Sequence, residues 1–238
     1  FIDQLLTHLK WTGDLNFAKQ MWPVLKKHLA WEKRNFDADN DGLYDAYACI
    51  WASDALGYSG GGVTHSSAYN YRANKMAADI ANLLGEDGTS YTNEANKILK
   101  AMQSKLWLKD KGWFAEYVDK LGLQLAHPAA ALWTVYHAME AGVASPLQQH
   151  QLLRYIDQHI PHIPIHSPDF PNDSLYLLST TNWQPYTWSI NNVALAENLH
   201  TALAYWQAGE SDNAFHLWRS TLLESMYMGS SPGNFQQL

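Results

Sequence analysis

The chain has 238 residues, of which 47% are hydrophobic and 16% are charged, so it is long enough to bury one sizeable core. Its formal net charge is -7 and it has no cluster of lysine or arginine, which argues against a nucleic-acid partner. No apolar run reaches membrane-spanning length, and the single cysteine, Cys49, excludes an internal disulfide. The chain begins at Phe1 inside a helix-like pattern, which predicts a mature product or a fragment.

Helical periodicity is the main signal along the chain. Residues 16–31 and 91–107 carry apolar side chains at helical spacing and keep one polar face. His127–Gly142 and Trp188–Gly209 are apolar nearly all round, which predicts helices buried on all sides. Residues 212–226 return to the amphipathic pattern. Strand signals are weak and limited to short pieces such as "GWFAEYVD".

The connections between these segments alternate in length. Each short turn places a glycine after an apolar segment and a capping residue before an amphipathic one; the glycines are Gly13, Gly85, Gly142 and Gly209. The other connections are long and rich in aromatic residues. This alternation predicts an all-α fold, an α/α toroid of helical hairpins with an inner and an outer ring. We expect eight main helices and no sizeable sheet, with the long loops forming the functional face.

Several segments resemble the six-hairpin (α/α)6-toroid glycosidases, as an unassigned bacterial branch of that superfamily. They include "WTGDLNFAKQMWPVL", "DADNDGLYDAY" and "GGGVTHSSAYNYRANKMAADIANLLG". The resemblance covers nearly the whole chain. It implies one catalytic domain over residues 1–238, a sugar-binding cleft, a carbohydrate substrate, and a periplasmic or secreted location. Four hairpins are visible where the superfamily has six, so we expect the missing hairpins to lie beyond one or both ends of this chain.

Glycoside hydrolysis uses two carboxyl groups, one to protonate the leaving oxygen and one to activate water or attack carbon. Asp54 and Glu116 are the two candidates, because aromatic rings nearby can raise a carboxyl pKa by desolvation. In the glycosidases that the chain resembles, the segment that crosses the mouth of the ring before an inner helix commonly carries the proton donor. Asp54 is expected to lie in that segment. For any single carboxylate, an ordinary surface role is the commoner outcome.

The expected substrate-binding residues are aromatic rings and neutral hydrogen-bonding groups near the predicted loop face: Tyr47, Trp51, His65, His127, Trp188, Asn191 and Asn192. His65 follows "SGGGVT" and should begin an inner helix, where the alternative to substrate binding is a local backbone contact. His127, before Pro128, should begin the next inner helix in the same way. We expect most of these side chains to converge with Asp54 and Glu116 on one concave face.

An aspartate-rich loop offers a candidate metal site. Asp37, Asp39 and Asp41 alternate ahead of Gly42, as in a calcium-binding loop. The twelfth position of such a loop, normally a bidentate glutamate, is Ala48, which argues against a standard EF-hand. We therefore predict a solvated turn and no required cofactor, with a looser structural calcium as the alternative.

Two rival functions remain open beside a glycoside hydrolase. A toroidal polysaccharide lyase would use Tyr or His to abstract a proton and would act only on acidic sugars. A non-catalytic carbohydrate-binding domain would need the aromatic residues without the carboxylates. Asp54 and Glu116 favour the hydrolase.

Overall fold

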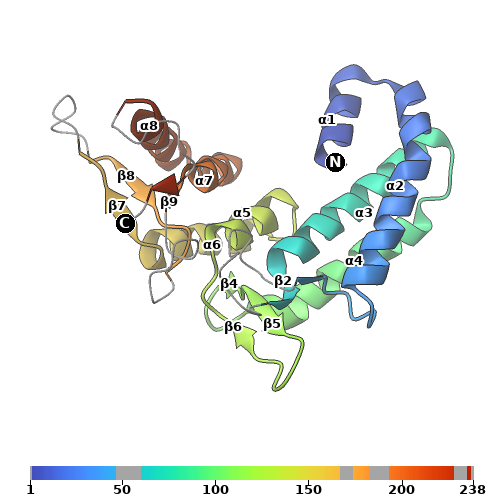
Figure 1. The fold of residues 1–238 in the computed structure, drawn as a ribbon, viewed down its shortest axis with the longest axis horizontal. Coiled ribbons are helices and arrows are strands. Elements are labelled where there is room, and N and C mark those ends of the chain that lie inside the picture. The colour runs from blue at the N-terminus through green and yellow to red at the C-terminus, as the bar shows by residue number, and fades with distance from the viewer. Residues whose placement is uncertain (1, 47–59, 167–173, 183–192, 228–234, 237–238) are drawn as a thin grey trace.

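The computed structural model describes residues 2–46, 60–166, 174–182, 193–227 and 235–236 (Figure 1). The described part contains eight α-helices: α1 (Ile2–Thr12), α2 (Leu15–Phe36), α3 (Thr64–Leu84), α4 (Thr89–Ala101), α5 (Leu132–Glu140), α6 (Pro146–His159), α7 (Leu195–Gln207) and α8 (Ser211–Tyr227). A π-helical turn, Met102–Leu106, continues α4. The expectation of eight main helices is confirmed.

The helices form four hairpins, each closed by a glycine in the left-handed backbone region. The φ angles are 65° at Gly13, 73° at Gly85, 74° at Gly142 and 86° at Gly209. Only glycine adopts this region without steric cost from Cβ, so these residues end the preceding helix. Helices α3, α5 and α7 contact one another in succession, and α4 and α8 pack against α3 and α7. Figure 1 shows the hairpins following one another along an open arc, as predicted for part of an α/α toroid.

Burial separates the two kinds of helix largely as predicted. In α5, seven of nine residues are buried, whereas in α4 only Ala95, Ile98 and Ala101 are. Helix α7 departs from the expectation of burial on all sides, because Leu199, Leu203 and Trp206 are exposed along one face. Helices α5 and α8 pack on α7, and this face stays open in the described part of the chain.

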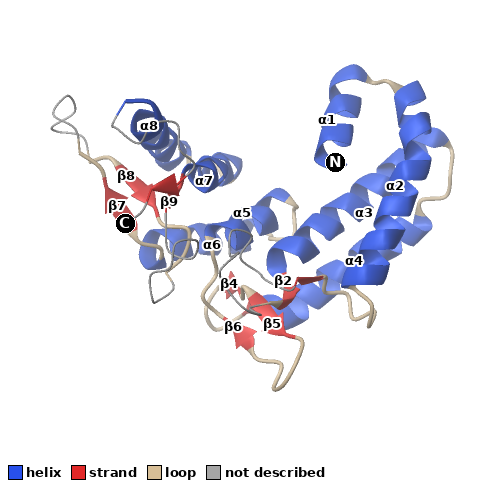
Figure 2. Cartoon of the chain, in the orientation of Figure 1, coloured by secondary structure: helices blue, strands red, loops and turns tan. Residues whose placement is uncertain are grey.

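The strands are short and lie beside the helices (Figure 2). They are β1 (Asp45–Ala46), β2 (Gly61–Val63), β3 (Trp107–Leu108), β4 (Trp113–Phe114), β5 (Tyr117–Asp119), β6 (Ala126–His127), β7 (His162–Pro164), β8 (Tyr176–Leu178), β9 (Val193–Ala194) and β10 (Phe235–Gln236). The largest sheet is antiparallel, in the order β1-β2-β5-β6, and the others are two-stranded. The prediction of little sheet is confirmed, and "GWFAEYVD" does contain strands.

The four-stranded sheet ties together the chain segments that lead into α3 and α5. Val63 pairs with Tyr117, and Tyr117 pairs with His127. The backbone of Glu116 accepts a hydrogen bond from Thr64 N at 3.1 Å and donates one to the carbonyl of His127 at 2.8 Å. The sheet therefore positions the N-terminal end of α3 beside the segment before α5.

The predicted helix start at His127 is wrong. His127 is the last residue of β6, and α5 begins only at Leu132. The intervening backbone is used for other contacts: the Pro128 carbonyl accepts the indole N–H of Trp113 at 2.7 Å, and Ala131 is extended at the helix boundary. Proline also disfavours helical geometry in the residue before it, so His127 is a poor helix start. His65, in contrast, lies one residue inside α3, as predicted.

No helix among the described residues is both long enough and apolar enough to cross a bilayer. The single-domain organisation of residues 1–238 stays a prediction.

Candidate active site

A cavity of about 520 Å³ lies where α2, α3 and α5 meet β1. Its walls contain the aromatic side chains of Phe36, Tyr44 and Tyr69. Its polar lining includes His65 and Asn70. Aromatic faces with a few hydrogen-bonding groups are the usual composition of a small-molecule site.

His65 of α3 and His137 of α5 both line this cavity, and their ring centroids lie 6.2 Å apart. Burial lowers the pKa of His65 to about 3 and that of His137 to about 4, so both imidazoles are neutral at pH 7. Within the described residues, His65 Nδ1 is buried and has no hydrogen-bond partner. A buried nitrogen without a partner is costly, so an incoming hydroxyl group would be stabilised there.

The cavity also carries two carboxylates, from Glu32 and Asp45. Burial raises the pKa of Asp45, while the ammonium of Lys120, which contacts its Oδ2, opposes that increase. Asp45 lies in β1 and pairs with Gly62 of β2, and Ala46 pairs with Gly61. Ala46 lines the cavity and Gly61 is its strand partner, so the two ends of the segment between them lie together beside the cavity.

The predicted residues Tyr47, Trp51 and Asp54 belong to that segment and lie outside the described residues, as do Trp188, Asn191 and Asn192. Their placement stays a prediction. The described candidates are His65, Glu116 and His127. His127 ends β6 and its carbonyl accepts the backbone N–H of Glu116, whereas His65 lies in α3. Of the three, only His65 lines the cavity of α2, α3 and α5.

Glu116 has no exposed surface, and both of its carboxylate oxygens accept hydrogen bonds from the start of α5. Oε2 accepts from Ala131 N at 2.7 Å and from the Thr134 hydroxyl at 2.5 Å, and Oε1 accepts from the Trp133 indole at 2.5 Å. The contact with Ala131 satisfies a backbone donor at the start of α5, and the other two satisfy buried side-chain donors. Glu116 therefore anchors α5, and its catalytic role stays a prediction.

The pKa of Glu116 is raised to about 7, chiefly by burial, with a further contribution from the charge of Glu197. The three hydrogen bonds act in the opposite direction because they stabilise the carboxylate. A buried carboxyl group with a pKa near 7 suits acid–base chemistry, but it also occurs in purely structural networks.

His127 points into a different environment from His65. Its ring stacks on Tyr117 with centroids 4.0 Å apart, and its Nε2 lies 2.9 Å from Asp119 Oδ1. Its predicted role in substrate binding stays a prediction.

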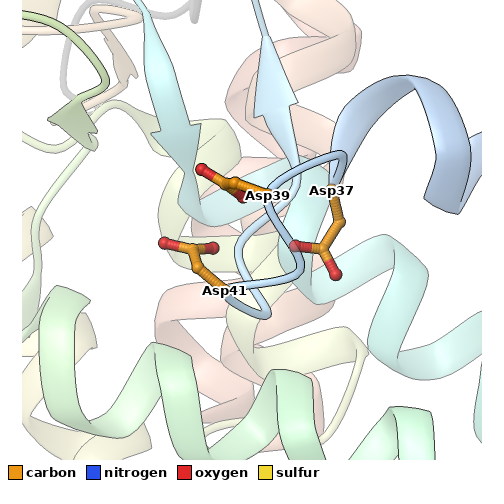
Figure 3. Close-up of side chains that lie close together, drawn as sticks. All are labelled: Asp37, Asp39 and Asp41. Carbon is orange, nitrogen blue, oxygen red and sulfur yellow. The ribbon is translucent and has the colours of Figure 1, made fainter.

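The aspartate-rich loop follows α2 directly, and the three carboxylates lie near one another (Figure 3). One oxygen from each of Asp37, Asp39 and Asp41 can be chosen so that all lie within 4.8 Å. The backbone at Gly42 has φ 88°, which agrees with the predicted turn. The expectation of a solvated turn holds only in part, because the Asp37 side chain has no exposed surface.

Each of these carboxylates already faces a lysine from another element. Lys97 Nζ lies 2.9 Å from Asp37, Lys105 Nζ lies 2.6 Å from Asp41, and Lys120 Nζ lies 3.7 Å from Asp39. The carboxylates that a bound cation would need are thus already paired with lysine ammonium groups. A structural calcium stays a prediction, and it would have to displace or share these lysines.

We expect removal of divalent cations to leave the thermal midpoint unchanged to within about 1 °C, because the lysines already compensate the carboxylates. Differential scanning calorimetry with and without a chelator measures this. The variant Asp39→Asn is the control, since Asp39 is exposed and makes the longest of the three lysine contacts. If the chelator lowers the thermal midpoint of the wild type but not that of Asp39→Asn, the result would instead establish a bound cation.

The four successive helical hairpins form the arrangement of part of an α/α toroid. Residues 7–153 match the bacterial alpha-L-rhamnosidase 6 hairpin glycosidase domain. The chain belongs to that family. No curated protein matches it in sequence.

Solved structures share the fold at low sequence identity. A GH63 mannosylglycerate hydrolase from Thermus thermophilus, in complex with glucose, superposes with a TM-score of 0.66 at 14% identity over 88% of this chain. A GH78 rhamnosidase of Bacillus sp. GL1 superposes with a TM-score of 0.64 at 16% identity over 90% of this chain. A rhamnosidase from Klebsiella oxytoca with rhamnose bound superposes with a TM-score of 0.60 at 17% identity, also over 90% of this chain. The matches cover 61%, 20% and 35% of those chains, respectively.

Sequence reasoning missed His137, Glu32 and Tyr69 as cavity residues. His137 sits in a predicted buried helix, where a histidine gives no signal of its own. Its proximity to His65 depends on how α3 and α5 pack, and no local pattern encodes that contact.

Proposed function

We propose that the chain forms part of the catalytic domain of a glycoside hydrolase that cleaves a plant or microbial oligosaccharide or polysaccharide by a two-carboxylate mechanism. The cavity between α2, α3 and α5 would hold one sugar unit, with the partly exposed rings of Phe36 and Tyr69 against it. The family name makes α-L-rhamnosides the first substrates to test.

One observation carries this proposal: β1 lines the cavity and pairs with β2, and Asp54 lies between these two strands in the sequence. Asp54 lies near the middle of the segment between Ala46 and Gly61, both ends of which are held by this pairing. Ala46 lines the cavity, so the segment that contains Asp54 in the sequence begins at the cavity wall. Asp54 would donate the proton to the leaving oxygen, and Glu116 remains our candidate for the second carboxylate.

The lack of a lysine or arginine in the described lining of the cavity supports a hydrolase over a lyase. The described lining of the cavity has no lysine or arginine, and the amino-acid sequence of segment 47–59 contains none. A lyase must hold the carboxylate of an acidic sugar, for which a cation is the usual partner. His65 and His137 would be uncharged at neutral pH and could not replace one.

A product assay on the purified protein tests the proposal. We expect release of reducing sugar from α-L-rhamnosides or from rhamnose-containing oligosaccharides, without any ultraviolet-absorbing unsaturated product. An unsaturated product would establish the lyase instead. Saturable binding without turnover by the full-length protein, across a panel of neutral and acidic glycans, would establish a non-catalytic carbohydrate-binding domain.

A further inference from the structure

A second pocket, of about 360 Å³, lies between the β3–β4 hairpin and α6, and it shares no lining residue with the candidate active site. Helix α6 supplies positions 150, 151, 154, 155, 158 and 159. These positions recur at intervals of three and four residues, so they form one face of the helix. The hairpin supplies Lys111 and Trp113. The close approach between hairpin and helix occurs at Gly112, where an added Cβ would lie 3.3 Å from the Gln151 amide nitrogen.

Trp113 forms a fixed aromatic wall of this pocket. Its indole N–H donates to the carbonyl of Pro128 at 2.7 Å, which sets the orientation of the ring. The ring also packs against Tyr155 and His159, at centroid distances of 4.6 Å and 5.1 Å. Trp113 remains partly exposed, so a rigid apolar surface meets the pocket. Such a surface suits the C–H face of a sugar ring, because it is already ordered before binding.

The charged lining of the pocket is entirely basic. Lys111 and Arg154 are exposed, and neither forms an ion pair with any described residue. Lys111 Nζ lies 5.8 Å from the centroid of the Trp113 ring, so a charge and an aromatic face are adjacent. The described lining includes no aspartate or glutamate, although the whole chain has a net charge of -7. Gln151 and Gln158 add amide groups that can both donate and accept.

We propose that this pocket is a second carbohydrate-binding site, which takes an acidic sugar unit such as a uronate residue within an oligosaccharide. The sugar ring would lie against Trp113, and its carboxylate would meet Lys111 and Arg154. Arginine suits this partner because its guanidinium can bind both oxygens of a carboxylate. A neutral sugar would leave both cations without a partner, and a free phosphate would leave the aromatic wall unused. The site does not depend on the proposed hydrolase activity.

Isothermal titration calorimetry with two matched trimers tests the proposal, because galacturonic acid and galactose differ only at C6. We expect the galacturonic acid trimer to bind measurably and the galactose trimer to bind at least about tenfold more weakly. Arg154→Gln and Lys111→Gln should each weaken binding of the acidic trimer by about tenfold, since each removes a charge-assisted contact. Lys109→Gln is the matched control: Lys109 is exposed on the same hairpin and does not line the pocket.

Thermal melting of each variant separates loss of binding from loss of folding. Equal binding of both trimers would overturn the acidic specificity. If Lys109→Gln and Arg154→Gln weaken binding of the acidic trimer equally, the location of the site is wrong. The location is also wrong if neither Lys111→Gln nor Arg154→Gln weakens that binding. Inorganic phosphate binding as tightly as the acidic trimer would overturn the role of the sugar ring. Failure of the folded wild-type protein to bind the acidic trimer would overturn the proposal as a whole.

Discussion

Replacing Asp54 by Asn is expected to lower turnover on substrates with poor leaving groups by about a hundredfold or more, because the variant keeps the shape and loses the titrating proton. Substrates with activated leaving groups need little protonation and should lose much less. Steady-state kinetics on a matched pair of glycosides, one with an alkyl and one with a nitrophenyl leaving group, measures both effects.

Asp79→Asn provides the control for this experiment. Asp79 is exposed on α3, so the same chemical change there should alter neither rate. Equal losses on both kinds of glycoside in Asp54→Asn would contradict the assignment of Asp54 as the acid and leave it a structural residue. If the wild-type protein produces no reducing sugar, the failure lies with the proposed function and not with Asp54 alone.

Glu116→Gln is expected to change how stability depends on pH. The folded-state pKa of Glu116 is raised from 4.5 to about 7 by burial, so the folded state favours the protonated carboxyl group. Its contribution to stability is therefore fully present below pH 4.5 and is lost as pH rises through about 7. The unfolding free energy of the wild type, measured relative to the variant by denaturant titration, should fall by about 3 kcal/mol over that interval.

The structural cost of Glu116→Gln is separate from this titration. A glutamine side chain has one oxygen where glutamate has two, so its NH2 group must face at least one of the donors on Ala131, Trp133 or Thr134. This unfavourable donor–donor contact should lower the unfolding free energy by about 1–3 kcal/mol. Glu210→Gln, at the partly exposed turn between α7 and α8, is the control. If the unfolding free energy of the wild type relative to Glu116→Gln instead increases with rising pH, the three hydrogen bonds outweigh burial in setting the pKa of Glu116. Loss of turnover in variant protein that remains folded would support the catalytic role, whereas turnover retained per folded molecule would leave Glu116 an anchor of α5.

The hairpin architecture could be predicted from sequence because its signals are local. Apolar spacing over 91–107 identifies a helix from neighbours within two turns, and Gly85 or Gly142 ends a helix through its own φ angle. The start of α3 before His65 follows from the same kind of signal. The predicted helix start at His127 is wrong because His127 pairs with Tyr117, which lies ten residues earlier in the chain, and this pairing has no local signal.

Only the tertiary structure decided which side chains meet, because those contacts join residues far apart in sequence through the packing of whole helices. The cavity pairs His65 with His137, the aspartate loop is fastened by Lys97 and Lys105, and Glu116 receives its hydrogen bonds from the first turn of α5. Residue type alone cannot distinguish a carboxylate that anchors a helix from one that faces substrate, since burial and donors together set its pKa. The amino-acid pattern thus determined four helical hairpins and their glycine turns. Helix packing determined which histidines, lysines and glutamates became neighbours.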